Sequence, residues 1–142
     1  MKKTIKILSG LFLIAALCLP LNACREKSVE EPLWENASYT EDAEFGSGSK
    51  TVYVEVKAED KSVTFKINTD KEILGEALLE HNLIAGEKGP YGLYVKVVNG
   101  ITADYDINQS YWAFNKNGES MQTGVDGAGI SGGEHFELVY TK

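Results

Sequence analysis

Cysteine, histidine and proline are scarce in this chain, and the first two absences exclude whole classes of site. Its 142 residues include two cysteines, two histidines and three prolines. Cys18 lies within an apolar N-terminal segment, so a mature chain without that segment keeps only Cys24 and has no disulfide, zinc knuckle or cysteine nucleophile. His81 and His135 have different sequence neighbours, which argues against a metal-binding pair. We therefore predict no metal site, no cofactor, and a domain that folds on its apolar core alone.

Long hydrophobic runs are also absent. The longest apolar stretch covers residues 7–21, and a bilayer-spanning helix needs about 20 residues. Three lysines precede this stretch, as in a secretory signal peptide. The residues that close it, Leu21-Asn22-Ala23-Cys24, resemble the lipobox of bacterial lipoproteins. That resemblance implies a signal peptide at residues 1–23 and an acylated (palmitate-type) Cys24; an ordinary secretory peptide is the alternative.

Basic residues are fewer than acidic residues. Loss of residues 1–23 removes three of the 14 basic residues and none of the 21 acidic ones, which leaves a net charge of −10. Such a surface repels phosphate backbones, so we expect no nucleic-acid partner. It also repels anionic headgroups, so acyl chains would have to hold the protein on the membrane. We expect an extracytoplasmic protein, lipid-anchored to the cell membrane or the outer membrane.

Residues 24–49 have the composition of a lipidated tether. Acidic side chains recur through the segment, and Gly46-Ser47-Gly48-Ser49 ends it. Charged linkers extend and Gly/Ser linkers flex, and neither buries enough apolar surface to order the chain. Leu33, Trp34, Tyr39 and Phe45 would then be isolated apolar residues, although docking of Trp34 on the domain or on a partner is an alternative.

Residues 50–142 have the patterning of one globular domain. Apolar residues alternate over 52–56 and 63–67 around a turn at 59–61, which predicts a hairpin of two strands. Thr69 and Glu72 have capping-box spacing before an amphipathic helix that ends near Asn82. A loop is expected at 86–92, then strands at 93–97, 111–115 and 136–140, with hairpin turns at Asn99-Gly100 and Asn117-Gly118. The predicted fold is α+β, a β-grasp-like mixed sheet with one packed helix.

Chemistry-bearing motifs are weak. Asp104-Tyr105-Asp106-Ile107-Asn108 matches the start of an EF-hand loop, but Gln109 stands where glycine is needed and Asn115 where glutamate is needed. A turn in which the Asp and Asn side chains bond their own backbone is the alternative to calcium. Residues 124–133 are glycine-rich but precede a strand instead of a helix, which favours a flexible loop over a dinucleotide site. We find no nucleophile elbow and predict that the protein is not an enzyme.

Aromatic residues are concentrated in one stretch. Six lie between residues 91 and 114: Tyr91, Tyr94, Tyr105, Tyr111, Trp112 and Phe114. Neighbours in a strand point to opposite faces, so Trp112 and Phe114 share a side opposite Tyr111. If one set fills the core, the other is exposed and can form a binding surface. Packing of all six in the core is the alternative.

Residues 64–142 resemble the small C-terminal domain of transcobalamin and its bacterial relatives. The resemblance rests on the order and spacing of five features: a helix at Asp70–Leu79, Gly89-Pro90-Tyr91, Tyr111-Trp112 with Asn117-Gly118, Gly124-Val125, and Gly132-Gly133-Glu134. It implies a β-grasp-like domain that covers one face of a corrinoid. The large helical domain that holds the other face in transcobalamin has no counterpart in this sequence, so the resemblance implies a partner.

Two functions follow as hypotheses. By resemblance, Pro90, Tyr91, Leu93 and Trp112 become candidate ligand contacts, and Tyr94 joins them as part of an aromatic rim. The protein would then be a non-catalytic, membrane-anchored ligand-binding lipoprotein that captures a cobalamin-type corrinoid with a partner. The alternative is a module that binds an envelope protein or a surface polymer, for instance by accepting a strand at a sheet edge.

Overall fold

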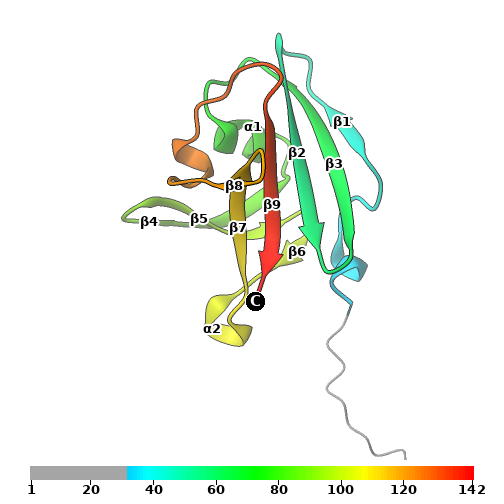
Figure 1. Ribbon diagram of the computed structural model, residues 1–142, viewed down its shortest axis with the longest axis vertical. Coiled ribbons are helices and arrows are strands. Elements are labelled where there is room, and N and C mark those ends of the chain that lie inside the picture. The colour runs from blue at the N-terminus through cyan, green and yellow to red at the C-terminus, as the bar shows by residue number, and fades with distance from the viewer. Residues whose placement is uncertain (1–31) are drawn as a thin grey trace, which may run out of the picture. The chain divides into compact units, whose positions relative to one another are not determined.

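The computed structural model describes residues 32–142 (Figure 1). The predicted signal peptide and Cys24 lie outside the described residues. A six-stranded mixed sheet and a three-stranded antiparallel sheet make up most of the fold. The elements in chain order are η2 (Leu33–Asn36), β1 (Ala43–Phe45), β2 (Lys50–Ala58), β3 (Lys61–Thr69), α1 (Leu74–Glu80), β4 (Ile84–Gly89), β5 (Gly92–Val98), β6 (Ile101–Thr102), α2 (Tyr105–Asn108), β7 (Tyr111–Lys116), β8 (Glu119–Ser120), η3 (Val125–Gly127) and β9 (His135–Thr141).

The large sheet follows the alternation read from the sequence. Its strand order is β1-β3-β2-β9-β7-β8, with β1/β3 and β2/β9 parallel and the other pairs antiparallel. The predicted hairpin of β2 and β3 is confirmed. The inward side chains of β2, β3 and β9 are fully or almost fully buried and form the centre of the core: Val52, Val54, Val56, Val63, Phe65, Ile67, Phe136 and Leu138. The α+β prediction of a mixed sheet with a packed helix is confirmed.

The helix α1 packs its apolar stripe against this core. Leu74, Ala77 and Leu78 are buried, as the helical spacing predicted. The predicted capping box is wrong, because the Thr69 hydroxyl accepts a hydrogen bond from the backbone N–H of Lys71 and α1 begins only after Ile73. Asn82 has the predicted left-handed conformation, with φ of 56°. Within residues 32–142 we find no helix long and apolar enough to cross a membrane.

Residues 84–102 form the second sheet instead of joining the first. The expected loop at 86–92 is wrong over most of its length, since β4 runs to Gly89 and pairs with β5. The glycines at positions 86 and 89 favoured a loop. In the structure both residues pair with residues of β5 in the ladder, and a register irregularity between Ala85 and Gly86 accommodates the glycine. The resulting β4–β5 hairpin extends away from the six-stranded sheet (Figure 1).

The N-terminal part of the described chain is docked on the domain. We call residues 32–49 the strap. Trp34 is 8% exposed and its indole N–H donates to the carbonyl of Ala58 over 2.9 Å. Further along, β1 pairs with β3, and Phe45 packs edge-to-face on Phe65 with ring centroids 5.4 Å apart. The structure therefore corrects the predicted tether over these residues, and the Trp34-docked alternative is the one observed.

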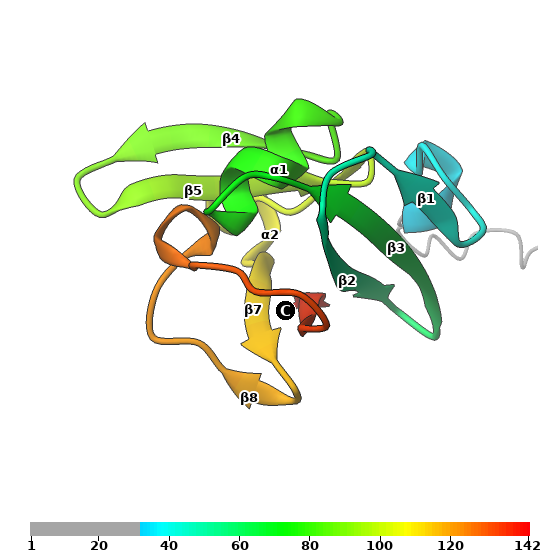
Figure 2. The same ribbon diagram turned by 90° about the horizontal axis from the view of Figure 1, so that it is seen from above.

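The glycine-rich loop at 124–133 is also more ordered than predicted. Val125, Ala128 and Ile130 are buried, and the backbone N–H of Leu74 donates to the carbonyl of Ala128 over 2.9 Å. Three small apolar anchors thus fasten the loop over the start of α1. Figure 2 shows η3 beside α1 and near the β4–β5 hairpin. The loop forms one wall of the candidate site.

Candidate functional site

The β4–β5 hairpin brings together four of the five residues predicted to contact a ligand. Pro90 and Tyr91 form its two-residue turn between the paired residues Gly89 and Gly92. Tyr91 is 98% exposed, and Tyr94 is 45% exposed. An aromatic ring so completely removed from the core contributes little to folding. Its position at the end of a projecting hairpin suits contact with another molecule.

The two faces of β5 have different environments. Leu93 is partly buried and packs against the core, whereas Tyr94 lies on the opposite face. On the Tyr94 face, Lys96 Nζ lies 3.4 Å from the carboxylate of Glu87, and the hydrogen bond that Lys96 donates to this carboxylate is the main cause of its raised pKa. The Tyr94 face is therefore aromatic and charged, while the Leu93 face continues the apolar interior.

Trp112, the fifth predicted contact residue, lies apart from the hairpin tip. It is 8% exposed, its indole N–H donates to the carbonyl of Lys96 over 3.2 Å, and its ring packs edge-to-face on Tyr140 at 5.6 Å. Tyr111, by contrast, is 41% exposed, as the predicted alternation required. Trp112 thus packs at the base of the hairpin and bonds its backbone. For Trp112 to contact a ligand on the exposed surface, its indole would have to move away from the Lys96 carbonyl and the Tyr140 ring.

A small pocket lies under the hairpin, between it, α1 and η3. It has a volume of about 180 Å³ and is lined by Ile73, Gly75, Glu76, Leu79, Lys88, Leu93 and Asp126. Leu79 is 44% exposed although it belongs to the amphipathic helix. The helical periodicity gave no signal for this pocket, because the pocket depends on the distance between α1 and a hairpin that follows it in the chain. Lys88 and Asp126 give its rim one charge of each sign.

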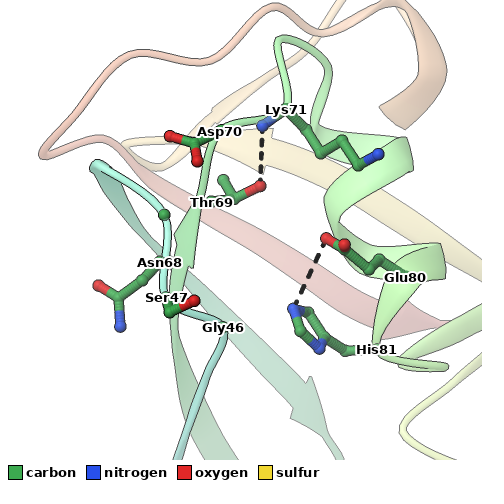
Figure 3. Close-up of a pocket in the computed structure, with 9 residues that line it drawn as sticks. Gly46, Ser47, Asn68, Thr69, Asp70, Lys71, Glu80 and His81 are labelled. Carbon is green, nitrogen blue, oxygen red and sulfur yellow. Dashed lines mark hydrogen bonds and ion pairs between the residues drawn. The ribbon is translucent and has the colours of Figure 1, made fainter.

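A larger polar pocket lies where the strap meets α1 (Figure 3). Its volume is about 470 Å³, and its lining consists of Gly46, Ser47, Gly48, Asn68, Thr69, Asp70, Lys71, Glu80 and His81. The Ser49 backbone N–H and hydroxyl both donate to the Asp70 carboxylate, and these hydrogen bonds lower the pKa of Asp70. Nε2 of His81 is 3.9 Å from the Glu80 carboxylate and has no hydrogen-bond partner among residues 32–142. The sequence gave no signal for this pocket, since the strap was expected to be a tether.

The two histidines lie in separate places. His81 packs on Phe45, with ring centroids 5.4 Å apart, whereas His135 stacks on Tyr53 and lies 3.5 Å from the Glu55 carboxylate. Across residues 32–142, we find no group of three or more His, Cys, Asp or Glu side chains placed to hold a metal ion.

The partial EF-hand motif is used for local capping. Asp104 is the N-cap of α2 and its carboxylate accepts from the backbone N–H of Asp106 over 3.0 Å. The Asn108 side chain accepts from the backbone N–H of Ser110 over 3.2 Å, and Gln109 ends the helix in the left-handed conformation. The alternative in which these side chains bond their own backbone is the one that the structure shows.

The chain resembles known proteins in both sequence and fold. Residues 72–142 match a family described as a domain of unknown function, DUF4430. The crystal structure of a candidate metal-binding protein from Ruminococcus gnavus is 38% identical, with a TM-score of 0.63, over 66% of this chain and 98% of that one. Haptocorrin in complex with Cbi shares the fold, at 19% identity and a TM-score of 0.51, over 69% of this chain and 26% of haptocorrin. No curated protein matches the sequence.

Proposed function

Since the chain belongs to the DUF4430 domain family, we propose from its sequence and structure together that it is a non-catalytic, extracytoplasmic ligand-binding protein. In this proposal the β4–β5 hairpin covers one face of a corrinoid, with Tyr91 and Tyr94 as its main contacts. The observation that carries the proposal is the 98% exposure of Tyr91 at the end of the hairpin.

The shape of the hairpin surface suits a large, partly apolar ligand. Tyrosine rings offer apolar area with a polar hydroxyl and lose little side-chain entropy when they bind. Corrinoids are wide macrocycles with apolar edges and polar amide side chains, so an open aromatic surface fits them better than a small closed cavity. The pocket of about 180 Å³ beneath the hairpin is too small for such a ring and could take only a substituent.

A partner would complete the binding site. The similarity to haptocorrin, which was crystallised with Cbi (cobinamide), extends over 26% of that protein. We propose that this chain covers one face of the corrinoid and that an envelope protein or a second domain covers the other face. Binding by this chain alone would then be weaker than binding by the assembled pair, because an open surface buries only part of the ligand.

Calorimetric titration of residues 25–142 with cobinamide and cobalamin tests the ligand. Micromolar binding that weakens about fivefold or more in Tyr91→Ala is the expected result, because exposed aromatic anchors carry much of an interface's binding energy. Tyr105→Ala is the matched control, since Tyr105 is also exposed but lies on α2. A flat titration at high micromolar concentrations would contradict corrinoid binding by this chain alone.

Membrane anchoring through Cys24 is the second part of the proposal. Its support is the sequence Leu21-Asn22-Ala23-Cys24 after an apolar segment preceded by lysines. In cells fed labelled palmitate, the wild type and Cys18→Ser should incorporate the label and Cys24→Ser should not. Incorporation that persists in Cys24→Ser would contradict the proposal.

An alternative function is binding of another protein, and the free edge of β4 favours it. In the described part of the chain no strand pairs with the outer edge of β4, and five of its six residues are exposed. An added strand could bind there through backbone hydrogen bonds. Stoichiometric capture of an envelope protein that is lost when the edge strand β4 is mutated but kept in Tyr105→Ala, together with a flat corrinoid titration, would favour this function.

A further inference from the structure

The β4–β5 hairpin projects with little support, so its orientation needs a physical cause. Of the residues of β4, only Ile84 is buried. At the base, the Trp112 indole holds the carbonyl of Lys96. Beyond Lys96, towards the turn, the partly buried side chains of Leu93 and Val95 pack against the core. Apolar contacts are non-directional, so a directional polar contact is needed to fix the orientation of the hairpin. Two-stranded hairpins are marginally stable on their own.

Asp126 provides a contact close to the tip. Its carboxylate accepts a hydrogen bond from the backbone N–H of Leu93 over 2.8 Å. Leu93 lies two residues after Tyr91, so this bond acts almost at the turn. Hydrogen bonds to charged acceptors are among the stronger ones in proteins. The bond fixes the end of the hairpin to η3.

The carboxylate itself is fixed to the core. Asp126 follows Val125, which is 2% exposed. A Cβ at Gly75 of α1 would lie 3.1 Å from the backbone of Asp126, so the helix and η3 are in close contact. The buried valine and the close packing on α1 leave Asp126 little freedom, and the hairpin is thereby tied to a rigid part of the fold.

Gly92 completes this arrangement. Its φ is +104°, and a Cβ there would lie 2.5 Å from one Asp126 carboxylate oxygen and 2.7 Å from the other. Any side chain at position 92 would therefore push the carboxylate away from the N–H of Leu93. Glycine at this position allows the carboxylate to approach the strand.

We propose that Asp126 is a positioning residue, a clasp that orders the β4–β5 hairpin and so presents Tyr91 and Tyr94 to a ligand. The ordering itself does not depend on which ligand binds. Its consequence for binding rests on the proposed function. Without the clasp, the hairpin samples other orientations and binding must order it, which weakens affinity.

Native-state hydrogen exchange of residues 25–142 tests the clasp directly. In Asp126→Ala the ladder amides of β4 and β5, which do not bond Asp126, should exchange at least about tenfold faster together with the Leu93 amide, while amides of β2 and β9 keep their protection. Asp126→Asn keeps an oxygen acceptor and should restore most of the protection, which mere loss of packing would not do. Glu119→Ala, an exposed acidic residue on β8, is the matched control. Unchanged exchange rates of the β4–β5 ladder amides in Asp126→Ala would overturn the proposal.

Substitution of Gly92 gives a second, independent test of the clasp. Gly92→Ala should speed Leu93 exchange in the wild type, and the additional effect should be clearly smaller in the Asp126→Ala background, because the carboxylate is no longer there to be displaced. Equal effects in both backgrounds would contradict the clasp.

Cobinamide titration of the same variants separates the two proposals. If the wild type binds, Asp126→Ala should weaken binding about fivefold or more and Asp126→Asn should restore it; faster exchange with unchanged affinity would overturn the positioning role. If the wild type does not bind, corrinoid binding by this chain alone is wrong, and the exchange data alone decide whether the clasp orders the hairpin.

Discussion

The strap and the β4–β5 hairpin depart in opposite directions from what their sequences indicate. The strap is more buried than its composition predicts, and the hairpin is more exposed. The strap, residues 32–49, has the acidic, Gly/Ser-ended composition of a linker, yet it buries Trp34 and adds strand β1 to the sheet. In the hairpin, residues 84–98, the second strand has the alternating apolar pattern of a half-buried strand over residues 93–97, yet β4 is largely exposed and the turn carries a tyrosine that is 98% exposed. A few anchor residues, more than average composition, determine whether each segment is docked on the domain or exposed.

The anchors of the strap are specific and far away in sequence. Asn99 is fully buried, and its side-chain amide bonds both the N–H and the carbonyl of Tyr39, over 2.9 and 2.8 Å. Tyr39, Phe45 and Phe65 form a cluster of edge-to-face rings with centroids 5.2 to 5.7 Å apart. The hairpin has two main polar anchors outside its own sheet, Trp112 and Asp126. We therefore expect perturbations of the strap to change stability and perturbations of the hairpin to change binding.

The largest expected effect is at Trp34. Trp34→Ala should lower the free energy of unfolding by about 3–5 kcal/mol, because it leaves a cavity and removes the indole hydrogen bond to the carbonyl of Ala58. Urea unfolding of residues 25–142 measures this change. A loss below about 1 kcal/mol would show that the strap is only loosely docked and would remove the contrast with the hairpin.

Asn99→Gly should have the next largest effect. Asn99 has φ of 53°, so glycine preserves the hairpin turn while it removes both hydrogen bonds to Tyr39. We expect a loss of about 1–3 kcal/mol in the free energy of unfolding. Asn117→Gly is the matched control, because Asn117 has the same φ in the second Asn-Gly turn. Equal losses in the two variants would indicate that turn conformation, and not the strap, is responsible.

Acid should loosen the far end of the strap. The pKa of Asp70 is lowered by the hydrogen bonds from Ser49, so the stabilisation is complete above the carboxyl's unfolded pKa and is lost as the pH falls below about 4. The Ser49 amide should therefore exchange faster than the intrinsic pH dependence predicts over that range. Asp70→Asn should remove this extra acid sensitivity. The Leu93 amide of the wild type gives the comparison within the hairpin.

The smallest effect on stability is expected at the hairpin tip. Tyr91→Ala should change the free energy of unfolding by less than about 0.5 kcal/mol, because the side chain is 98% exposed. Urea unfolding beside Trp34→Ala gives the sharpest contrast between the two regions. A destabilisation above about 1 kcal/mol would mean that Tyr91 packs on the domain in solution and would weaken its assignment as a ligand contact.

Local signals in the sequence predicted much of the sheet correctly. Both Asn-Gly pairs form hairpin turns with positive φ at each residue, 53° and 79° at Asn99 and Gly100, and 53° and 83° at Asn117 and Gly118. The alternation in β2, β3 and β9 predicted which side chains are buried. These signals succeed because each depends on residues within one turn or one strand.

The candidate site was predicted less well for the opposite reason. Pro90, Tyr91, Leu93 and Tyr94 are close together in sequence, and the hairpin keeps them together. Asp126 is 33 residues beyond Leu93, and no spacing rule connects a residue of a glycine-rich loop with a backbone N–H of β5. The polar pocket around His81 depends on a strap whose composition indicated disorder.

The sequence by itself determined the strands β2, β3, β5, β7 and β9, their inward faces, the two Asn-Gly turns and the scarcity of cysteine and histidine. These properties follow from local backbone preferences and from alternating side-chain polarity. The tertiary structure alone decided that the strap docks, that β4 to β6 separate into a second sheet, and that Asp126 reaches the hairpin. Those outcomes depend on single contacts between residues distant in the sequence, such as Trp34 with Ala58 and Asn99 with Tyr39. The average composition of a segment does not predict such contacts.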